Sequence, residues 1–192
     1  MNNSSTVAMI SLGCPKNLVN SEEMLALLQD AGYAFTDDLA KADAAIINTC
    51  AFIESAKTES IENIMEAAQY KQTGKLKALV VTGCLAERYR EQIHAEMPEV
   101  DCVVGIGGNG QISALIQRTL EGEETECFPE KQQLSLCGSR ILTTPFYTAY
   151  LKVAEGCNNR CSYCAIPDIR GNFRSLPIED CVAQARELAE QG

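Results

Sequence analysis

Residues 44–50 read AAIINTC, a short apolar run that closes on two polar residues and a cysteine. A similar pattern, an apolar run followed by a cysteine, occurs twice more, as VAMISLGC at residues 7–14 and KALVVTGC at residues 77–84. Runs this short and this apolar predict strands that are covered on both faces of a sheet. Three such strands, each followed by a cysteine, decide the expected fold.

Helical patterns separate these runs. We expect helices at residues 21–31, 55–70, 87–97 and 111–120, and further strands at residues 33–36 and 100–106. In the first helix Ser21 is a suitable N-cap, and Gly32 is a suitable stop. Strands that alternate with helices imply βαβ units with right-handed crossovers. The expected fold class is therefore α/β, with an N-terminal doubly wound, mostly parallel sheet.

The pattern changes after residue 122. An acidic stretch without a clear period follows, so we expect a linker at residues 123–145 between a first domain (1–122) and a second region (146–192). Residues 146–154 alternate as in a strand, and residues 178–191 follow a helical pattern. Together with the loop between them they form one βα unit, the first of a larger domain. A chain with one such unit is not expected to turn over a substrate alone.

Composition and charge narrow the class of protein. The chain has 192 residues, a formal net charge of −10 and no run of Lys or Arg, which disfavours nucleic acid as a partner. No apolar run is long enough for a membrane span and no signal-peptide pattern is present, so we expect a cytoplasmic protein. Ten cysteines in that compartment favour metal or redox use over disulfides. The single histidine, His94, lies far from any cysteine pair, which disfavours a zinc site containing histidine.

A cluster of cysteines lies in the second region. Cys157, Cys161 and Cys164 fall within eight residues, and such a loop can wrap three thiolates around one iron–sulfur cluster. A closed 4Fe–4S cluster takes four thiolates, so three leave one iron open. Zinc is the main alternative, although no fourth ligand is nearby. A redox C-x2-C pair is a further alternative, and it leaves Cys157 without a role.

Cys14, Cys50 and Cys84 share a different context, because each follows a predicted strand. The C-terminal ends of parallel strands meet along one edge of the sheet, where ligands bind. Three cysteines distant in sequence can therefore share one crevice and hold a second cluster. Gly13 and Gly83 leave room for close approach of the backbone. The alternative for each cysteine is a small buried hydrophobic residue.

Residues 154–171, AEGCNNRCSYCAIPDIRG, resemble the radical S-adenosylmethionine superfamily, with a C-x3-C-x2-C loop after a strand. The resemblance implies that the open iron chelates S-adenosylmethionine, which is then cleaved to a 5′-deoxyadenosyl radical. A doubly wound domain with three strand-end cysteines ahead of such a loop is similar to the methylthiotransferase family. In that family the first domain carries an auxiliary 4Fe–4S cluster that takes part in sulfur delivery. The similarity covers residues 7–192.

The resemblance thus implies two 4Fe–4S clusters and S-adenosylmethionine as cofactors. The implied ligands are Cys157, Cys161 and Cys164 for the radical cluster, and Cys14, Cys50 and Cys84 for the auxiliary cluster. No cofactor contact beyond the open iron is assigned, and no residue, Tyr163 and Arg170 included, is given a catalytic role. The cysteines without an expected role are Cys102, Cys127, Cys137 and Cys181.

Residues 10–22, ISLGCPKNLVNSE, are similar to the subgroup called RimO, which methylthiolates an aspartate of a small-subunit ribosomal protein. Members that modify tRNA usually carry Gln-Met-Asn where this chain has Pro-Lys-Asn at residues 15–17. Asn20 replaces the aspartate expected there, and no cluster ligand is affected. The expected partners are the ribosomal protein and an electron donor such as flavodoxin or ferredoxin. The alternatives are the same chemistry on a tRNA adenosine, and a non-catalytic zinc or redox-sensing protein.

Overall fold

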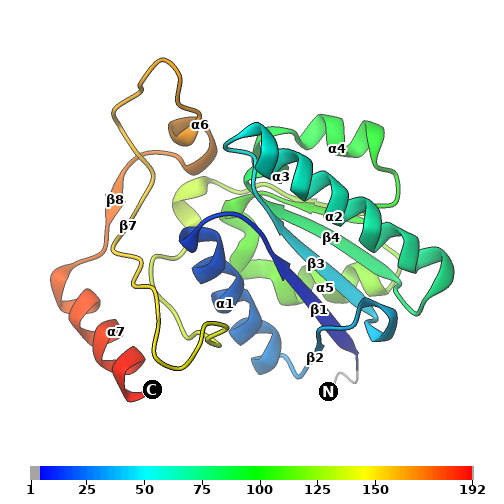
Figure 1. Cartoon of the computed structure of the whole chain (residues 1–192), viewed down its shortest axis with the longest axis horizontal. Helices are drawn as coiled ribbons and strands as arrows, with labels where there is room; N and C mark the ends of the chain where they lie inside the picture. The colour runs from blue at the N-terminus through cyan, green and yellow to red at the C-terminus, as the bar shows by residue number, and fades with distance from the viewer. Residues whose placement is uncertain (1–4, 192) are drawn as a thin grey trace.

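The computed structural model describes residues 5–191, and a six-stranded sheet forms the centre of this part of the chain (Figure 1). Its strands are β1 (Thr6–Ser11), β2 (Ala34–Thr36), β3 (Ala44–Thr49), β4 (Ala78–Gly83), β5 (Cys102–Val104) and β6 (Thr125–Cys127). The strand order is β2-β1-β3-β4-β5-β6, and each neighbouring pair is parallel. Strand β2 pairs with one side of β1, and β3 pairs with the other side. The gap between β1 and β3 is therefore the topological switch point of a doubly wound α/β fold, as expected.

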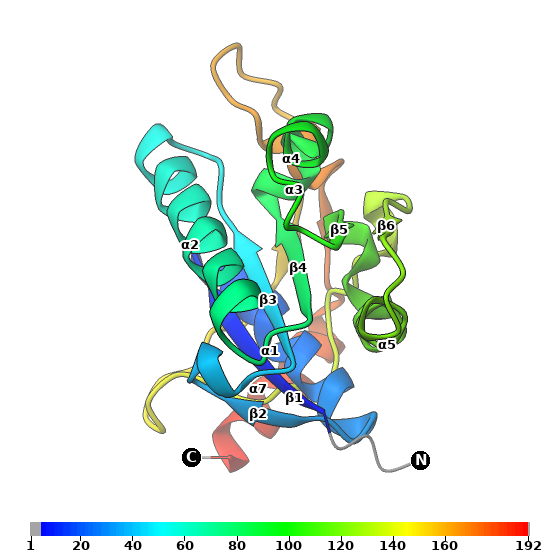
Figure 2. The ribbon, with the colours of Figure 1, turned by 90° about the vertical axis from the view of Figure 1, so that its right-hand side faces the viewer.

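Helices cover both faces of the sheet, as the view along it shows (Figure 2). They are α1 (Pro15–Asp30) and α5 (Ile112–Leu120) on one face, and α2 (Glu54–Thr73), α3 (Cys84–Arg88) and α4 (Arg90–Glu96) on the other. Successive strand residues enter opposite cores: Ile46 packs in the core of Met24, and Ile47 in that of Ile64. This two-sided burial explains why the central strands β3 and β4 are largely apolar and fully buried. Short 3-10 helices at η1 (Leu39–Lys41), η2 (Ile106–Gln111) and η3 (Lys131–Gln133) complete the connections.

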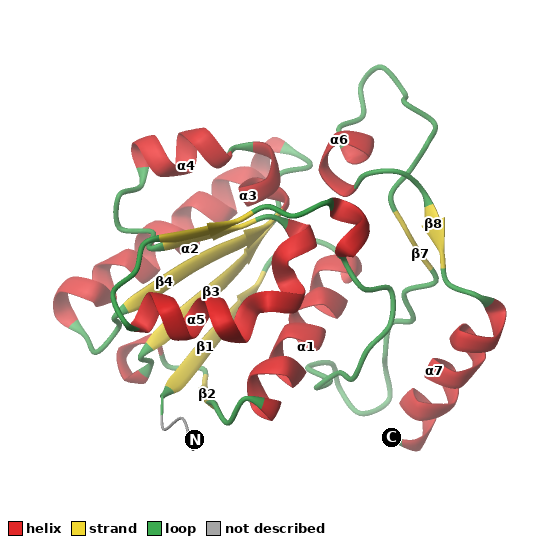
Figure 3. Ribbon diagram, turned by 180° about the vertical axis from the view of Figure 1, so that it is seen from behind, coloured by secondary structure: helices red, strands yellow, loops and turns green. Residues whose placement is uncertain are grey.

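The second region lies beside α1 (Figure 3). It contains a two-stranded antiparallel sheet of β7 (Ala154–Glu155) and β8 (Arg174–Ser175), and the helices α6 (Ile166–Arg170) and α7 (Ile178–Glu190). The strand expected over residues 146–154 is wrong except at its last residue. A strand needs a hydrogen-bonding neighbour, and in the described part of the chain β8 offers one only to Ala154 and Glu155.

Three local expectations differ from the structure. The first helix begins at Pro15 rather than Ser21, because proline suits the first helical position and Ser21 is buried inside the helix. The helix expected over residues 87–97 is broken at Tyr89, which separates α3 from α4. The segment expected as a linker, 123–145, adds β6 to the edge of the sheet.

Candidate metal centre

Cys14, Cys50 and Cys84 lie together at the C-terminal edge of the sheet. Cys14 is the N-cap residue of α1, Cys50 follows β3 directly, and Cys84 is the first residue of α3. All three line one cavity of about 1100 Å³. Cys14 is exposed, whereas Cys50 and Cys84 are buried. The sequence-based expectation that these thiols share a crevice is confirmed, and the crevice lies at the β1–β3 switch point.

Two glycines make this convergence possible. Gly13 has a φ of +91°, and a Cβ there would lie 2.7 Å from the Cβ and 2.9 Å from the Sγ of Cys50. Gly83 has a φ of +92°, and a Cβ there would lie 2.4 Å from the carbonyl oxygen of Thr49. A side chain at either position would meet both a strained backbone and an atomic overlap. Gly13 and Gly83 therefore allow the loops after β1 and β4 to close on the end of β3.

Asn17 ties the ends of β1 and β3 together. Its Nδ2 donates to the carbonyl oxygens of Leu12 (2.9 Å) and Thr49 (2.8 Å). Asn48 returns the contact, because its Nδ2 donates to the carbonyl oxygen of Asn17 and to Ser21 Oγ, both at 2.8 Å. Both asparagine side chains are buried, so each bond replaces water at a polar group that would otherwise be unpaired. The network holds Cys14 and Cys50 in a fixed relation, a role that sequence reasoning did not find.

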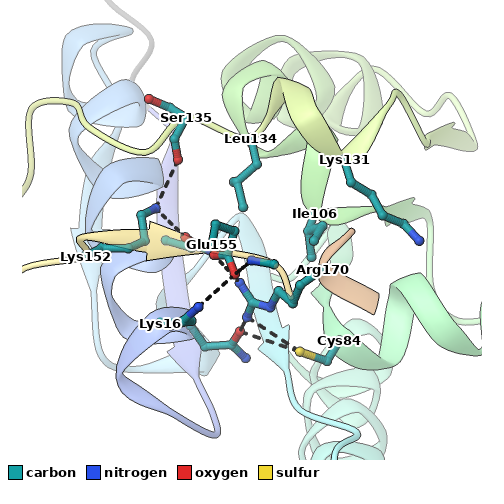
Figure 4. Close-up of polar contacts among 12 residues, drawn as sticks. Lys16, Cys84, Ile106, Lys131, Leu134, Ser135, Lys152, Glu155 and Arg170 are labelled. Atoms are coloured by element: carbon teal, nitrogen blue, oxygen red, sulfur yellow. Dashed lines mark hydrogen bonds and ion pairs between the residues drawn. The ribbon is translucent and has the colours of Figure 1, made fainter. Parts of the chain in front are cut away.

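A buried ion cluster forms one wall of the cavity (Figure 4). The carboxylate of Glu155 accepts from Lys16 Nζ at 3.2 Å and from Arg170 Nη1 at 3.1 Å. Arg170 Nη2 also donates to Asn17 Oδ1, and it lies 3.6 Å from Cys84 Sγ. Sequence reasoning gave Arg170 no role. Its partners lie 15, 153 and 86 residues away along the chain, so no local pattern indicated them.

The charges in this cluster shift the pKa values of its members. Burial opposes ionisation of Glu155, but Arg170 and Lys16 hold its pKa below the usual value. Burial also acts against the charge of Arg170, yet Cys84 and Glu155 raise its pKa. Burial raises the pKa of the Cys84 thiol, and the Arg170 guanidinium opposes that rise. Glu155 and Arg170 are therefore charged at neutral pH, and a positive group faces the sulfur of Cys84.

The second set of cysteines lies on a loop that projects between β7 and α6 (Figure 1). Cys161 is exposed, and Cys157 and Cys164 are partly exposed. The base of the loop is closed by Cys157 N, which donates to the carbonyl oxygen of Gly171 at 3.1 Å. Gly156, with a φ of +74°, permits this closure, because a Cβ there would lie 2.1 Å from the carbonyl oxygen of Asn172. The sequence places the three thiols on one loop, and the structure leaves that loop open to a ligand.

The helix α6 connects the loop with the cavity. It begins two residues after Cys164, and its Ile166 and Arg170 line the cavity of the first three cysteines. Because Arg170 Nη2 lies 3.6 Å from Cys84 Sγ, the helix that follows the second cysteine loop adjoins the first cysteine set. Their proximity was not predicted, because the sequence contains no signal for how the second region docks on the first.

Each donor set consists of three thiols, and thiolates are ligands of both zinc ions and iron–sulfur clusters. A structural zinc ion takes four ligands, with sulfur at about 2.3 Å. Within residues 5–191, no three His, Cys, Asp or Glu side chains are arranged to hold one metal ion. A cubane cluster is wider than one ion, so its thiolates lie farther apart, and three of them leave one iron free for a further ligand.

Further buried pairs fix the second region against α1. Glu22, fully buried, accepts from Arg140 Nη2 at 2.5 Å and from the backbone N of Thr143 at 2.8 Å. Lys152 Nζ contacts Glu23 at 3.1 Å and Asn20 Oδ1 at 3.0 Å. Burial lowers the pKa of Lys152 and raises that of Glu23, and their mutual attraction opposes both shifts. Asn20, which replaces the expected aspartate, therefore lies in this docking contact.

The four remaining cysteines lie outside both sets. Cys102 is buried in β5, Cys127 ends β6, Cys137 is exposed and Cys181 lies in α7. Within residues 5–191, no helix has both the length and the apolar character to cross a membrane.

Comparisons with known proteins agree with the geometry. A protein named ribosomal protein uS12 methylthiotransferase RimO from Desulforamulus reducens is 52% identical over 97% of this chain and 43% of its own length. Proteins of the same name from Lachnoclostridium phytofermentans and Geobacter sulfurreducens are 50% and 47% identical, over 95% and 97% of this chain. The chain spans 43% or less of the length of these three relatives. The expected resemblance to the RimO subgroup is confirmed.

Two family models match successive parts of the chain. Residues 151–192, which include the projecting cysteine loop, match the radical SAM superfamily. Residues 6–105, which contain strands β1 to β5 and the cysteines Cys14, Cys50 and Cys84, match the model described as uncharacterized protein family UPF0004. The UPF0004 match covers more than half of the chain, and the chain therefore belongs to the UPF0004 family.

Proposed function

We propose that this chain carries the sulfur-donating site and the start of the radical site of a methylthiotransferase. The reaction inserts a methylthio group at an unactivated carbon of an aspartate in ribosomal protein uS12, by radical S-adenosylmethionine chemistry. The single observation that carries the proposal is the cavity in which Cys14, Cys50 and Cys84 meet, with Ile166 and Arg170 of α6, the helix that follows the second cysteine loop, in its wall. We assign residues 1–122 and 146–192 to two domains, and the segment between them, 123–145, adds β6 to the sheet of the first domain before it reaches the second.

Each set of three thiols holds one 4Fe–4S cluster in this proposal. Cys157, Cys161 and Cys164 hold the radical cluster, and Cys14, Cys50 and Cys84 hold the auxiliary cluster. When bound, the clusters supply an electron for cleavage of S-adenosylmethionine and a sulfur carrier for the methylthio group. An electron donor such as flavodoxin or ferredoxin completes the system.

The chain's own residues orient these groups. Gly13 and Asn17 hold Cys14 and Cys50 at the switch point. Phe52 and Ile53 line the cavity and are about half exposed, so they place apolar surface where the cavity meets solvent. Gly156 allows the base of the projecting loop to close, because its backbone lies against that of Gly171 and Asn172.

Metal analysis of the anaerobically reconstituted chain tests both sites. We expect about eight iron ions and as many acid-labile sulfides per chain, since each 4Fe–4S cluster contributes four. Replacing Cys14, Cys50 and Cys84 by alanine should leave about four iron ions, and so should replacing Cys157, Cys161 and Cys164. Cys137→Ala, at an exposed cysteine outside both sets, is the matched control and should retain about eight. Zinc without acid-labile sulfide would contradict the proposal and favour a zinc protein.

An activity assay tests the substrate. The protein at the length of its relatives, supplied with S-adenosylmethionine, a reductant and a sulfide source, should add a methylthio group to uS12, detected as a mass increase on the modified peptide. Transfer RNA from a strain that lacks this modification is the competing substrate. Modified tRNA beside unmodified uS12 would overturn the choice of substrate and keep the reaction class.

A further inference from the structure

Arg170 is built into the wall of the cavity in a way that a docking role alone does not require. It comes from α6 in the second region, is 3% exposed, and reaches into the cavity of the first domain. Burying a guanidinium costs several kcal/mol unless its donors are paired. Glu155 pairs one edge of the group, and Asn17 Oδ1 and Cys84 Sγ accept from the other.

The charges around Arg170 do not balance among themselves. Lys16 and Arg170 share the single carboxylate of Glu155, so this ion cluster carries one excess positive charge. The other buried cations nearby are matched, because Lys152 pairs with Glu23 and Arg140 with Glu22. Of the other residues that line the cavity, Glu59 alone is acidic. Glu59 is exposed and Lys16 is partly exposed, so water screens both charges, and the buried positive charge beside the thiol of Cys84 is that of Arg170.

The contact with sulfur needs the shape of arginine. The guanidinium is a planar fork, so Nη1 can hold Glu155 while Nη2 points to Cys84. A lysine at this position could keep a positive charge but could not span both partners. Hydrogen bonds to the sulfur ligands and nearby charge are among the factors that set the reduction potential of an iron–sulfur cluster.

We propose that Arg170 is a positioning residue of the auxiliary site, where its guanidinium hydrogen-bonds the sulfur of Cys84 and raises the reduction potential of the cluster held by Cys14, Cys50 and Cys84. This inference rests on the proposed function. In this inference Arg170, a residue of the second region, sets the reduction potential of a cluster that is bound in the first domain. Docking of the two regions therefore completes the electrostatic environment of the auxiliary site.

Redox titration of the auxiliary cluster tests the inference. The background is the 192-residue chain with Cys157, Cys161 and Cys164 replaced by alanine, which leaves one cluster to observe. Arg170→Met should shift the midpoint potential to a more negative value and change the electron paramagnetic resonance spectrum of the reduced cluster. Arg170→Lys retains the charge without the fork, so its shift should be smaller and of the same sign.

Arg174→Met is the matched control. Arg174 lies in the same segment and donates to the backbone carbonyl oxygens of Gln132 and Leu134, so it anchors the second region without touching a thiol. Its replacement should leave the potential unchanged. An Arg170→Met variant that folds, as judged by circular dichroism, but loads no iron while Arg174→Met loads fully also supports the positioning role. The midpoint potential is then measured in Arg170→Lys.

Two outcomes separate the possible failures. A background protein without iron and acid-labile sulfide would overturn the proposed auxiliary site, and this inference with it. A background protein with a cluster whose potential is the same in Arg170→Met or, if that variant does not load, in Arg170→Lys would overturn the inference alone. An equal shift in Arg174→Met would do the same, because it would trace the effect to docking rather than to the contact with sulfur.

Discussion

Replacing Glu22 with glutamine should loosen the docking of residues 140–143 on α1. The Glu22 carboxylate is fully buried and accepts four hydrogen bonds, two from Arg140 and two from Thr143. Glutamine has nearly the same shape, but it has one acceptor oxygen and no charge, so its NH2 group would face donors. The Arg140 guanidinium, whose side chain is 4% exposed, would then lie buried without a counter-charge.

The expected cost follows from these contacts. Removing one partner of a buried ion pair destabilises a protein by roughly 3–5 kcal/mol. Glutamine retains one acceptor, so we expect the lower end, about 3 kcal/mol. Because the contacts of Glu22 join two parts of the chain, the loss should appear first as local opening of this interface. A free energy of about 3 kcal/mol corresponds to a more than hundredfold increase in the open population.

Amide hydrogen exchange measures that opening. The amides of Thr143 and Ile141 donate to the side chain and the backbone oxygen of Glu22, so both report on this docking contact. In Glu22→Gln their exchange should accelerate by about 100-fold. Glu62→Gln, on the exposed surface of α2, is the control and should change stability by less than about 0.5 kcal/mol.

A double-mutant cycle with Arg140→Met isolates the pair. Once Arg140 is replaced, the loss of charge at Glu22 should cost less than it does in the parent, by at least about 1 kcal/mol. Less than threefold faster exchange at Thr143 in Glu22→Gln would refute the reasoning. Strictly additive effects in the cycle would show that the pair does not couple the two regions.

Three further predictions concern the first domain. Gly13→Ala should destabilise the protein by about 1–3 kcal/mol and reduce iron loading, because its Cβ would meet Cys50 at a positive φ. Gly110→Ala is the control, because there is open space around its Cα, and it should leave iron loading intact. Burial opposes ionisation of Asp43, but two lysines and a backbone N–H hold its pKa below 3.8, so its stabilisation is present above pH 4 and lost as the pH falls below it. The free energy of unfolding of Asp43→Asn, measured with denaturant, should therefore lie about 1 kcal/mol below that of the parent at pH 7, and the difference should shrink as the pH falls below 4; a constant difference would contradict the assignment. Asn17→Ala should cost about 2–3 kcal/mol in the same assay, since it leaves two buried carbonyl oxygens unpaired, and a loss under about 0.5 kcal/mol would contradict the role of this side chain.

The sheet and the strand-end cysteines were predictable because their signals are local. An apolar run such as residues 78–83 is long enough to indicate a strand, and parallel topology then brings its C-terminal end to the same edge as the others. The start of α1 was not predictable by capping rules. Ser21 resembles a cap, but its hydroxyl contacts Ser11 and Asn48 from inside the helix, and those partners are tertiary.

The parts that sequence reasoning missed depend on long-range contacts. Strand β6 has three residues and gains its identity only from pairing with β5, so residues 125–127 carry no period. Arg170 and Glu155 flank the cysteine loop, and two opposite charges at the base of such a loop were a signal that could have been noticed. Their partners Lys16 and Asn17, however, lie more than 130 residues earlier, and only docking brings them together.

The helix α1 contacts both the cavity of the first cysteine set and the second region. Its N-terminus carries Cys14 at the cap and then Lys16 and Asn17, which hold Glu155 and Arg170 of the second region. One to two turns later the same helix presents Glu22, whose carboxylate holds Arg140. A rigid helix with both functions cannot change its contact with the second region without moving the cavity wall. The residues that shape the cavity therefore also hold the base of the projecting loop, and in the proposed function a sulfur donor and a radical source need such a fixed relation to meet at one carbon atom.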